Sequence, residues 1–311
     1  MKIQIMVKEN KVKKLLLFSL FLLSFNGHAL TIQWFGTTCL AITYKKQTIL
    51  LDPFFNRPSL LQILSPFSYQ PNPQVVDQWL ITLPKESKLE AILTSHSHYD
   101  HILDAPYLLE KTQAHFYGSK TAIHIIHSPQ INSERLHRID YKKRFTRGDF
   151  KITPFAGEHP PHIFNYIWAN GKRDKPLKKP APLYQYKMGK VYNFLIETPE
   201  GTVLFHPSAY PSKQITDVLK HKKIDILVLG IANRRSSLEL IENVVKPSKA
   251  QFLITGHHDD LFEKMKLTKK AQQIPLLLSS DYDEWSEALS KEVPSLKSLE
   301  LTYSEKFKLP K

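Results

Sequence analysis

Cysteine is nearly absent from this chain of 311 residues, because Cys39 is its only thiol. A single sulfur can form neither a disulfide framework nor a thiolate metal cluster. Any bound metal must therefore be held by nitrogen and oxygen. Cys39 itself lies in an apolar strand pattern, and we expect it to be a small buried hydrophobic residue.

The signatures of several function classes are also missing. The sequence has no Gly-rich phosphate loop, no GxGxxG fingerprint and no G-x-S-x-G nucleophile elbow. Nucleotide cofactors and a serine nucleophile of that kind are therefore not indicated. Glycine is sparse, with 10 residues, whereas the 21 prolines indicate long, stiffened connections. The composition, 42% hydrophobic and 23% charged, is that of an ordinary globular protein with a sizeable core.

The first 29 residues are typical of a secretory signal peptide. Five lysines precede the apolar run LLLFSLFLLSF at residues 15–25, and the small residues Gly27 and Ala29 follow it. That run is about half as long as the roughly 20 residues of a membrane-spanning helix. We expect cleavage after Ala29, a periplasmic or secreted protein, and one domain over residues 30–311. No transmembrane segment is expected once the leader is removed.

The chain is basic, with a formal charge of +14 at pH 7. Loss of the leader, with its five lysines and Glu9, would leave a charge of about +10. No nucleic-acid-binding module is recognisable, so nucleic acid is not an expected partner. An exported basic protein more readily meets anionic lipids and envelope polymers, and we expect a small-molecule or lipid substrate that carries negative charge. The oligomeric state is left open.

Apolar runs with strand and helix spacing alternate along the chain. Strands are predicted at residues 31–36, 39–44, 48–52, 89–95, 114–119, 150–155, 225–232 and 251–256, around Leu136, and as a hairpin over residues 192–206. Helices are predicted near residues 102–109, 120–127 and 237–245, and a loop over residues 53–76. Without repeats or a linker, this alternation predicts two sheets flanked by helices.

A cluster of metal-binding residue types follows the apolar run 89–95. Side chains two residues apart at the end of a strand point the same way, so His96 and His98 can hold one ion. The turn after them can aim Asp100 and His101 at a neighbouring position. Imidazole and carboxylate suit Zn²⁺, Mn²⁺ and Fe²⁺ alike. The alternative, a polar loop that caps a sheet, is disfavoured by four ligand-type residues within six positions.

These residues resemble the metallo-β-lactamase superfamily. WFGTTCLAI and TILLDP are similar to the opening of the branch that contains N-acyl-phosphatidylethanolamine phospholipase D and the bacterial ascorbate-phosphate lactonases. SHSHYDH is similar to the central motif of that branch, and the resemblance extends with diminishing strength from Thr31 to Asp260. It implies an α/β protein, a four-layer α/β/β/α sandwich with one or two divalent ions, zinc first among them, at one edge between the sheets.

The resemblance also implies a set of ligands. His96, His98 and His159 would hold the first ion, with His162 as the competitor of His159. Asp100, His101 and His257 would hold the second ion, and His258 would lie beside His257 in the pocket wall. Asp52 corresponds to an early family aspartate that would orient a ligand histidine. Its alternative role is that of an ordinary turn residue before Pro53.

One position departs from the family pattern. The acid that bridges both ions normally follows the strand read here as GTVLF, but Pro207 stands in its place. His206 and Ser208 are the neighbouring residues that could take its place. If only one ion binds, Asp100 is free to act as the catalytic base on a water held by that ion.

The expected function is that of an exported hydrolase which uses a metal-activated hydroxide on an ester, lactone or phosphodiester. The alternative is a catalytically degenerate binding protein of the same fold, which the missing bridging acid favours. β-Lactam hydrolysis is not expected, because the resemblance lies with another branch.

A long connection follows His159. We expect residues 160–190 to form a basic lid that attracts anionic groups to the metals, with apolar contact from Tyr166, Trp168, Tyr184 and Tyr186. The alternative is a solvated surface loop whose lysines aid solubility. The seven basic residues concerned are Lys172, Arg173, Lys175, Lys178, Lys179, Lys187 and Lys190.

Overall fold

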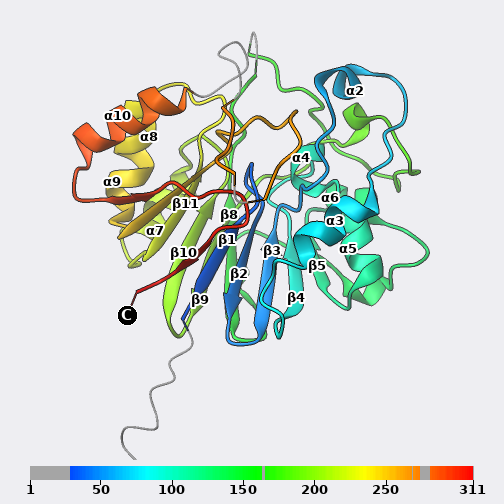
Figure 1. Cartoon of the computed structure of the whole chain (residues 1–311), viewed down its shortest axis with the longest axis horizontal. Helices are drawn as coiled ribbons and strands as arrows, with labels where there is room; N and C mark the ends of the chain where they lie inside the picture. The colour runs from blue at the N-terminus through cyan, green and yellow to red at the C-terminus, as the bar shows by residue number, and fades with distance from the viewer. Residues whose placement is uncertain (1–28, 163–164, 268, 274–280, 311) are drawn as a thin grey trace, which may run out of the picture.

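Two sheets pack against each other between outer layers of helices in the computed structural model (Figure 1). The structure describes residues 29–162, 165–267, 269–273 and 281–310. The predicted signal peptide, residues 1–29, lies outside these ranges except for Ala29. No helix within the described ranges combines the length and hydropathy needed to cross a bilayer.

Each sheet has seven strands. The first has the order β14 (Lys306–Lys308), β1 (Thr31–Trp34), β2 (Leu40–Tyr44), β3 (Gln47–Leu51), β4 (Lys88–Leu93), β5 (His115–Gly118) and β6 (Leu136–Arg138). The second has the order β13 (Lys297–Leu299), β12 (Phe252–Gly256), β11 (Ile226–Gly230), β10 (Gly201–His206), β9 (Tyr192–Thr198), β8 (Phe150–Ala156) and β7 (Phe145–Arg147).

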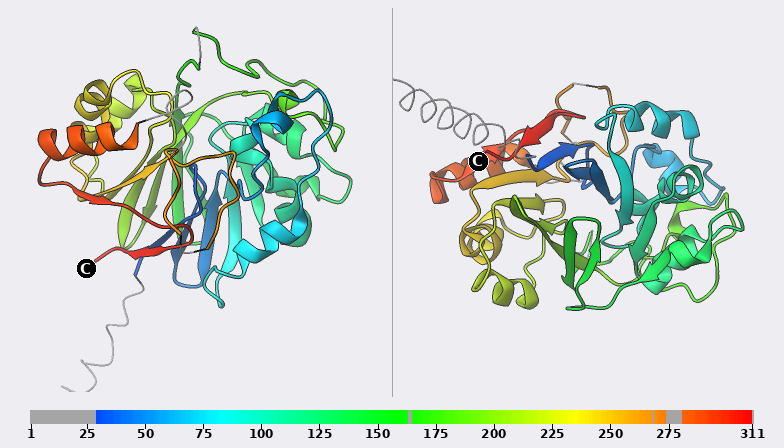
Figure 2. Two further views of the ribbon diagram at one scale, coloured as in Figure 1. Left: turned by 45° about the horizontal axis from the view of Figure 1, so that its top comes forward. Right: turned by 90° about the horizontal axis from the view of Figure 1, so that it is seen from below.

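The helices are divided between the two outer sides (Figure 2). On the side of the first sheet lie α2 (Leu60–Leu64), α3 (Pro73–Leu80), α4 (Tyr99–Ile102), α5 (Ala105–Lys111) and α6 (Lys120–Ile126). On the side of the second sheet lie α7 (Lys213–Leu219), α8 (Ser237–Leu240), α9 (Lys246–Ser248) and α10 (Tyr282–Glu292). Two short 3-10 helices are η1 (Ser133–Arg135) and η2 (Leu183–Gln185), and the π-helix η3 (Ile241–Val245) joins α8 to α9. The predicted α/β/β/α sandwich is confirmed.

The central strands of the second sheet are buried on both faces. In β11, Ile226 and Val228 belong to the core between the sheets, whereas Leu227 and Leu229 belong to the core under the helices. Successive side chains of a strand point to opposite faces, so a strand with both faces covered needs apolar residues at every position. This explains the continuous apolar runs of the sequence.

The strands that lead into the predicted ligands share one direction within each sheet. β3, β4 and β5 are mutually parallel, and β1 runs with them because two antiparallel pairings, through β2, separate β1 from β3. By the same reasoning β8 runs with β10, β11 and β12. The carboxyl ends of these strands therefore lie at a common edge of each sheet, where α/β proteins place their ligand sites.

Two local predictions need correction, and one region was left without any. Residues 53–76 are not all loop, because α2 and the start of α3 lie there. Ser59 and Gln62 form a capping box at α2, and Asn72 caps α3 with Pro73 in its first turn, so both helices carried start signals. The predicted helix 102–109 is divided between α4 and α5. The elements after residue 260 were not predicted.

Candidate metal centre

The six predicted ligand side chains lie in two groups at the carboxyl ends of the strands. His96, His98 and His159 form the first triad, and Asp100, His101 and His257 form the second. Within each triad, one potential ligand atom of each residue lies within 4.8 Å of those of the other two. Residues up to 157 positions apart in the sequence are thus brought together in one triad, since Asp100 follows β4 of the first sheet and His257 follows β12 of the second.

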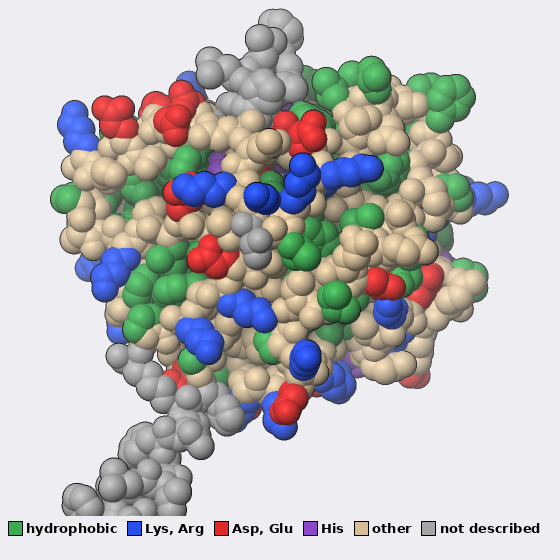
Figure 3. Space-filling model, in the orientation of Figure 1, with side chains coloured by type: hydrophobic (Ala, Val, Ile, Leu, Met, Phe, Trp, Pro, Cys, Tyr) green, Lys and Arg blue, Asp and Glu red, His purple; other side chains and the backbone are tan. Residues whose placement is uncertain are grey.

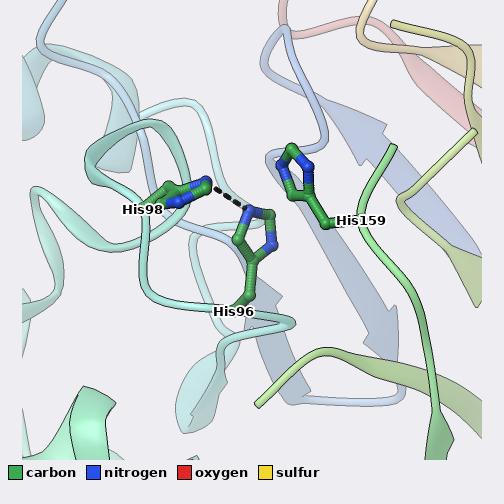
Figure 4. Close-up of side chains that lie close together, drawn as sticks. All are labelled: His96, His98 and His159. Atoms are coloured by element: carbon green, nitrogen blue, oxygen red, sulfur yellow. Dashed lines mark hydrogen bonds between the residues drawn. The ribbon is translucent and has the colours of Figure 1, made fainter. Parts of the chain in front are cut away.

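The first triad is formed by three imidazoles that converge on one space (Figure 4). His96 Nε2 lies 3.1 Å from His98 Nδ1. The ring of His159, which follows β8, lies 5.0 Å from the ring of His96 and 4.9 Å from that of His98. His96 and His98 are both buried.

The second triad is organised by the carboxylate of Asp100. Asp100 Oδ2 lies 3.3 Å from His101 Nε2 and 3.3 Å from His257 Nε2. The two triads are neighbours, because the ring centroids of His96 and His101 are 3.9 Å apart. An arrangement of two adjacent donor sets is suited to two ions that act on one substrate.

The protonation state of the first triad suits the binding of a cation. Burial, followed by the neighbouring imidazole of His162, lowers the pKa of His159 to about 3. Burial and the surrounding histidines also hold the pKa values of His96 and His98 well below the usual range. These three rings are therefore neutral at pH 7, which is the protonation state in which imidazole binds metal.

Specific ring nitrogens are left for the ions. His159 Nδ1 lies 2.6 Å from the carbonyl oxygen of Pro160, to which it can only donate, so the lone pair is on Nε2. His96 Nε2 and His98 Nδ1, which are 3.1 Å apart, are the nitrogens of those two rings that approach each other. Three neutral imidazoles whose nitrogens lie this close together fit a divalent ion held by nitrogen and oxygen.

Asp52 supports the second triad, as expected for a residue that orients a ligand. Its Oδ2 accepts from His101 Nδ1 at 2.8 Å, which leaves His101 Nε2 facing Asp100 and His257. Ser95 donates to Asp52 through its backbone N–H and its hydroxyl, each at 2.6 Å. Burial alone would lower the pKa of His101, but the carboxylates of Asp100 and Asp52 outweigh it and raise this pKa to about 10.

The turn between β1 and β2 contacts both histidines of the second triad. Thr38 Oγ1 lies 3.0 Å from Asp52 Oδ2 and 3.0 Å from His101 Nδ1. The carbonyl oxygen of Thr37 accepts from the backbone N–H of His257 at 2.8 Å. Sequence reasoning missed this role, because neither threonine belongs to a recognisable ligand motif.

A buried ion pair holds the same turn from its other side. Asp259 Oδ1 accepts from the backbone N–H of Thr37 at 2.6 Å, and its Oδ2 accepts from Arg57 Nη2 at 2.9 Å and from Tyr303 Oη at 3.2 Å. The side chains of Arg57 and Asp259 are fully buried. The space around them requires Gly36, where an added Cβ would lie 2.2 Å from Arg57 Nη2 and 2.7 Å from Asp259 Oδ2. This pair, too, was not predicted.

A cavity of about 360 Å³ opens over both triads. Pro207 and Ser208 line it, but the Ser208 hydroxyl donates to the carbonyl oxygen of Glu158. His206 is fully buried in β10 and does not line the cavity. Of the described lining residues, only Asp100 is acidic, so neither neighbour of Pro207 replaces the bridging acid of the family pattern.

The two competitor histidines have other surroundings. His162 lines the cavity, but it lies outside the first triad, and its Nδ1 accepts from the backbone N–H of Trp168 at 3.2 Å. His258 is not in the wall of the metal cavity, contrary to expectation. Its ring is stacked between Trp34, at 5.3 Å, and Tyr282, at 4.5 Å, because the chain turns at His257 with a φ of +57°.

The basic side chains of the predicted lid do not reach the lining of the cavity. None of the seven basic residues between 170 and 190 is among the residues that line the cavity, whereas Trp168 is. The segment is packed onto the fold instead. Leu177, Leu183 and Tyr186 are buried, and the carbonyl oxygen of Met188 accepts from the backbone N–H of Ser97 at 2.9 Å.

Comparisons with known proteins agree with this architecture. A family model described as "Beta-lactamase superfamily domain" matches residues 47–238, more than half of the chain. A UPF0173 metal-dependent hydrolase of Myxococcus xanthus (strain DK1622) is 26% identical over 212 residues, which cover 65% of this chain and 62% of that protein.

Solved structures with a similar fold cover most of the chain. The metallo hydrolase Igni18 of Ignicoccus hospitalis has a TM-score of 0.60 and 11% identity, over 91% of this chain and 99% of its own. The metallo-beta-lactamase fold protein YhfI of Bacillus subtilis has a TM-score of 0.56 and 14% identity, over 90% of this chain and 99% of its own. Together with the family match and the paired triads at the strand ends, they lead to one assignment: this chain belongs to the metallo-β-lactamase superfamily.

Proposed function

We propose that this protein is a metal-dependent hydrolase that adds water across an ester, lactone or phosphodiester bond. The observation that carries the proposal is the convergence of two adjacent triads of nitrogen and oxygen donors on one cavity. The name of the Myxococcus relative, a metal-dependent hydrolase, supports it. Divalent ions held there would supply Lewis acidity, which lowers the pKa of water toward neutrality and polarises the oxygen of the bond under attack.

The residues of the chain prepare this chemistry. His96, His98 and His159 present neutral rings, and the hydrogen bond to Pro160 fixes the ring nitrogen of His159 that faces the cavity. Asp52 does the same for His101. Asp100 contributes a carboxylate to the second triad, and where a single ion binds in the first triad this carboxylate can accept a proton from the attacking water.

The metal is proposed to be zinc. Three imidazoles in one triad, and two imidazoles with a carboxylate in the other, are sets that zinc accepts, with manganese and iron as competitors. Metal analysis of protein purified without added metal identifies the ion and its stoichiometry.

The second candidate function is that of a binding protein without catalysis. It is favoured by Pro207 at the position of the bridging acid and by the hydrogen bond that occupies Ser208. Under this alternative the protein binds metal and turns over no substrate. The hydrolase is preferred, because the two triads keep all the ligands expected from the family pattern except the bridging acid.

One experiment separates the two functions. The metal-loaded protein is screened with carboxylic esters, lactones and phosphodiesters, before and after chelation and after zinc is restored. We expect chelator-sensitive turnover, lowered about 10²- to 10⁴-fold by Asp100→Asn. The exposed His221, replaced by asparagine, is the matched control and should leave the rate unchanged. Bound metal without turnover of any substrate class would favour the binding protein.

Three further proposals rest on sequence alone. The first is membership in the branch with N-acyl-phosphatidylethanolamine phospholipase D and the ascorbate-phosphate lactonases, which the WFGTTCLAI and SHSHYDH segments support. The second is export to the periplasm or medium, which residues 1–29 support. The third is a small-molecule or lipid substrate; the negative charge expected from the net charge of +14 is not retained, because no described lining residue of the cavity is a lysine or arginine.

A further inference from the structure

Much of the lining of the metal cavity is apolar. Leu60, Ile63 and Leu64 of α2 line it, and their spacing places all three on one face of that helix. Trp168 lines it after β8, and Leu261 and Phe262 line it after β12. Figure 3 shows hydrophobic side chains gathered at the upper right of the molecule, where Figure 1 places α2.

The same lining carries little charge outside the triads. No lysine or arginine is among the described lining residues, and Asp100 is the only acid. An anionic group that extended beyond the ions would therefore be desolvated without a cationic partner, which is unfavourable.

An uncharged hydrogen-bonding group completes the lining. Asn233 lines the cavity, and its side chain forms no hydrogen bond with another described residue. An amide can both donate and accept, so it suits a neutral polar group of a ligand. Binding sites commonly combine apolar walls with a few such polar groups that set the orientation of the ligand.

We propose that the cavity binds the apolar acyl group of a neutral carboxylic ester or lactone, against α2, Trp168 and Phe262. This inference rests on the proposed hydrolase function and narrows its substrate class. Water adds to the carbonyl carbon, the bond between that carbon and the ester oxygen breaks, and the proton passes to the leaving oxygen. The products are a carboxylic acid and an alcohol, so no oxidant or reductant is needed.

The exposure of the α2 leucines supplies the driving force. Leu60 is 40% exposed and Leu64 is 66% exposed, although both line the cavity. An acyl chain that covers them removes apolar surface from water on both partners. At about 0.8 kcal/mol for each buried methylene, kcat/KM should rise about three- to fourfold for each methylene until the cavity is filled.

The test uses the metal-loaded full-length protein and p-nitrophenyl esters from acetate to octanoate. Leu64→Ser removes part of the proposed acyl wall. Leu61→Ser is the matched control, because Leu61 belongs to the same short helix, is 82% exposed and does not line the cavity. A parallel series carries a terminal carboxylate on the acyl chain. Binding of 1-alkanols of increasing length, followed by thermal stabilisation, provides a readout that needs no turnover.

We expect kcat/KM to rise with chain length, Leu64→Ser to flatten the series and Leu61→Ser to leave it steep. The terminal carboxylate should cancel the gain. A flat series, or a preference for the carboxylated chains, overturns the proposal. Equal losses in both leucine variants, confined to micellar esters, would also overturn it, because α2 would then contact the aggregate rather than an acyl chain in the cavity.

Failure of the proposed function gives a different pattern. In one outcome no ester is hydrolysed, longer alkanols still bind more tightly, and only Leu64→Ser weakens alkanol binding. That outcome supports the apolar pocket and contradicts the proposed hydrolase function. If esters are hydrolysed without any dependence on chain length, hydrolysis stands and the apolar pocket falls.

Discussion

At the scale of single residues, the same side chain takes opposite roles according to its neighbours. His159 sits among other imidazoles, and burial lowers its pKa to about 3. His101 is also buried, yet two carboxylates raise its pKa to about 10. The first ring is a ready ligand at pH 7, whereas the second must release a proton before its Nε2 binds an ion. Metal binding at the second triad is therefore coupled to proton release.

The buried acid Asp259 is expected to position the second triad through Thr37. In a zinc titration of the metal-free protein, Asp259→Asn should weaken the second ion about 10- to 100-fold and leave the first unchanged. The reason is that the turn held by Asp259 contacts His101 and His257, and no ligand of the first triad, through the hydrogen bonds described.

The control for this prediction is Asp104→Asn. Asp104 is an equally buried acid, but it accepts from Phe55 and Asn56 instead of the turn at Thr37. Because Asp259→Asn leaves Arg57 buried without its partner, the double variant Arg57→Met/Asp259→Leu is measured as well. Equal weakening of both ions in these variants would mean a general loss of folding rather than a positioning role.

At the scale of elements, strand direction decides where chemistry is placed. Asp52, His96, His159 and His257 each follow a strand whose carboxyl end lies at the metal edge. The segment between β3 and β4, which was predicted to be a loop, contains α2, and residues of α2 form one wall of the cavity. Connections at such an edge carry specificity, while the strands hold the reacting groups.

The predicted signal peptide, residues 1–29, can be tested directly by experiment. We expect the exported protein to begin at Leu30, as measured by intact mass and N-terminal sequencing of periplasmic and secreted fractions. Ala29→Arg should block cleavage, because signal peptidase requires a small residue there. A chain that lacks residues 1–29 should stay in the cytoplasm. Recovery of the uncleaved wild-type chain from the cytoplasm would contradict export.

At the scale of the whole molecule, two apolar cores fix two sheets against each other and thereby the two triads. One core extends from the space between the sheets to the helices α3, α5 and α6, and the other lies beneath α7, α8 and α10. The buried Arg57–Asp259 pair connects the segment before α2 with the segment after β12 across the metal edge. Metal binding and global stability should therefore depend on each other.

Acid should destabilise the metal-free molecule through its buried histidines. Burial lowers the pKa of His206 to about 4, whereas the unfolded chain binds this proton near pH 6.5. The stability that the neutral His206 contributes is therefore fully present above about pH 6.5 and is lost as the pH falls toward about 4. The free energy of unfolding decreases by up to about 1.4 kcal/mol for each pH unit per histidine.

Urea unfolding between about pH 4.5 and about pH 7.5 measures this slope. His206→Leu should reduce the slope of the unfolding free energy against pH by the contribution of one bound proton. Above about pH 7 the unfolding free energies of the two proteins should change with pH in the same way. Identical slopes below pH 6.5 would mean that His206 is protonated as readily in the folded protein as in the unfolded chain.

The sequence by itself determined the central strands and the donor types. Its apolar runs predicted the central strands because those strands are buried on one or both faces, and a single cysteine limited the ligands to nitrogen and oxygen. The strand-end spacing of His96 and His98 placed them together because local geometry suffices for neighbours.

Only the tertiary structure decided which distant groups meet. The pair Arg57 and Asp259, 202 positions apart, carries no local signal, because two isolated charges read as surface residues until folding buries them together. The basic side chains of residues 170–190 were expected near the metals, but none of them lines the cavity, for the same reason. Composition records their charge, but the direction in which those side chains point depends on packing against residues far away in the chain.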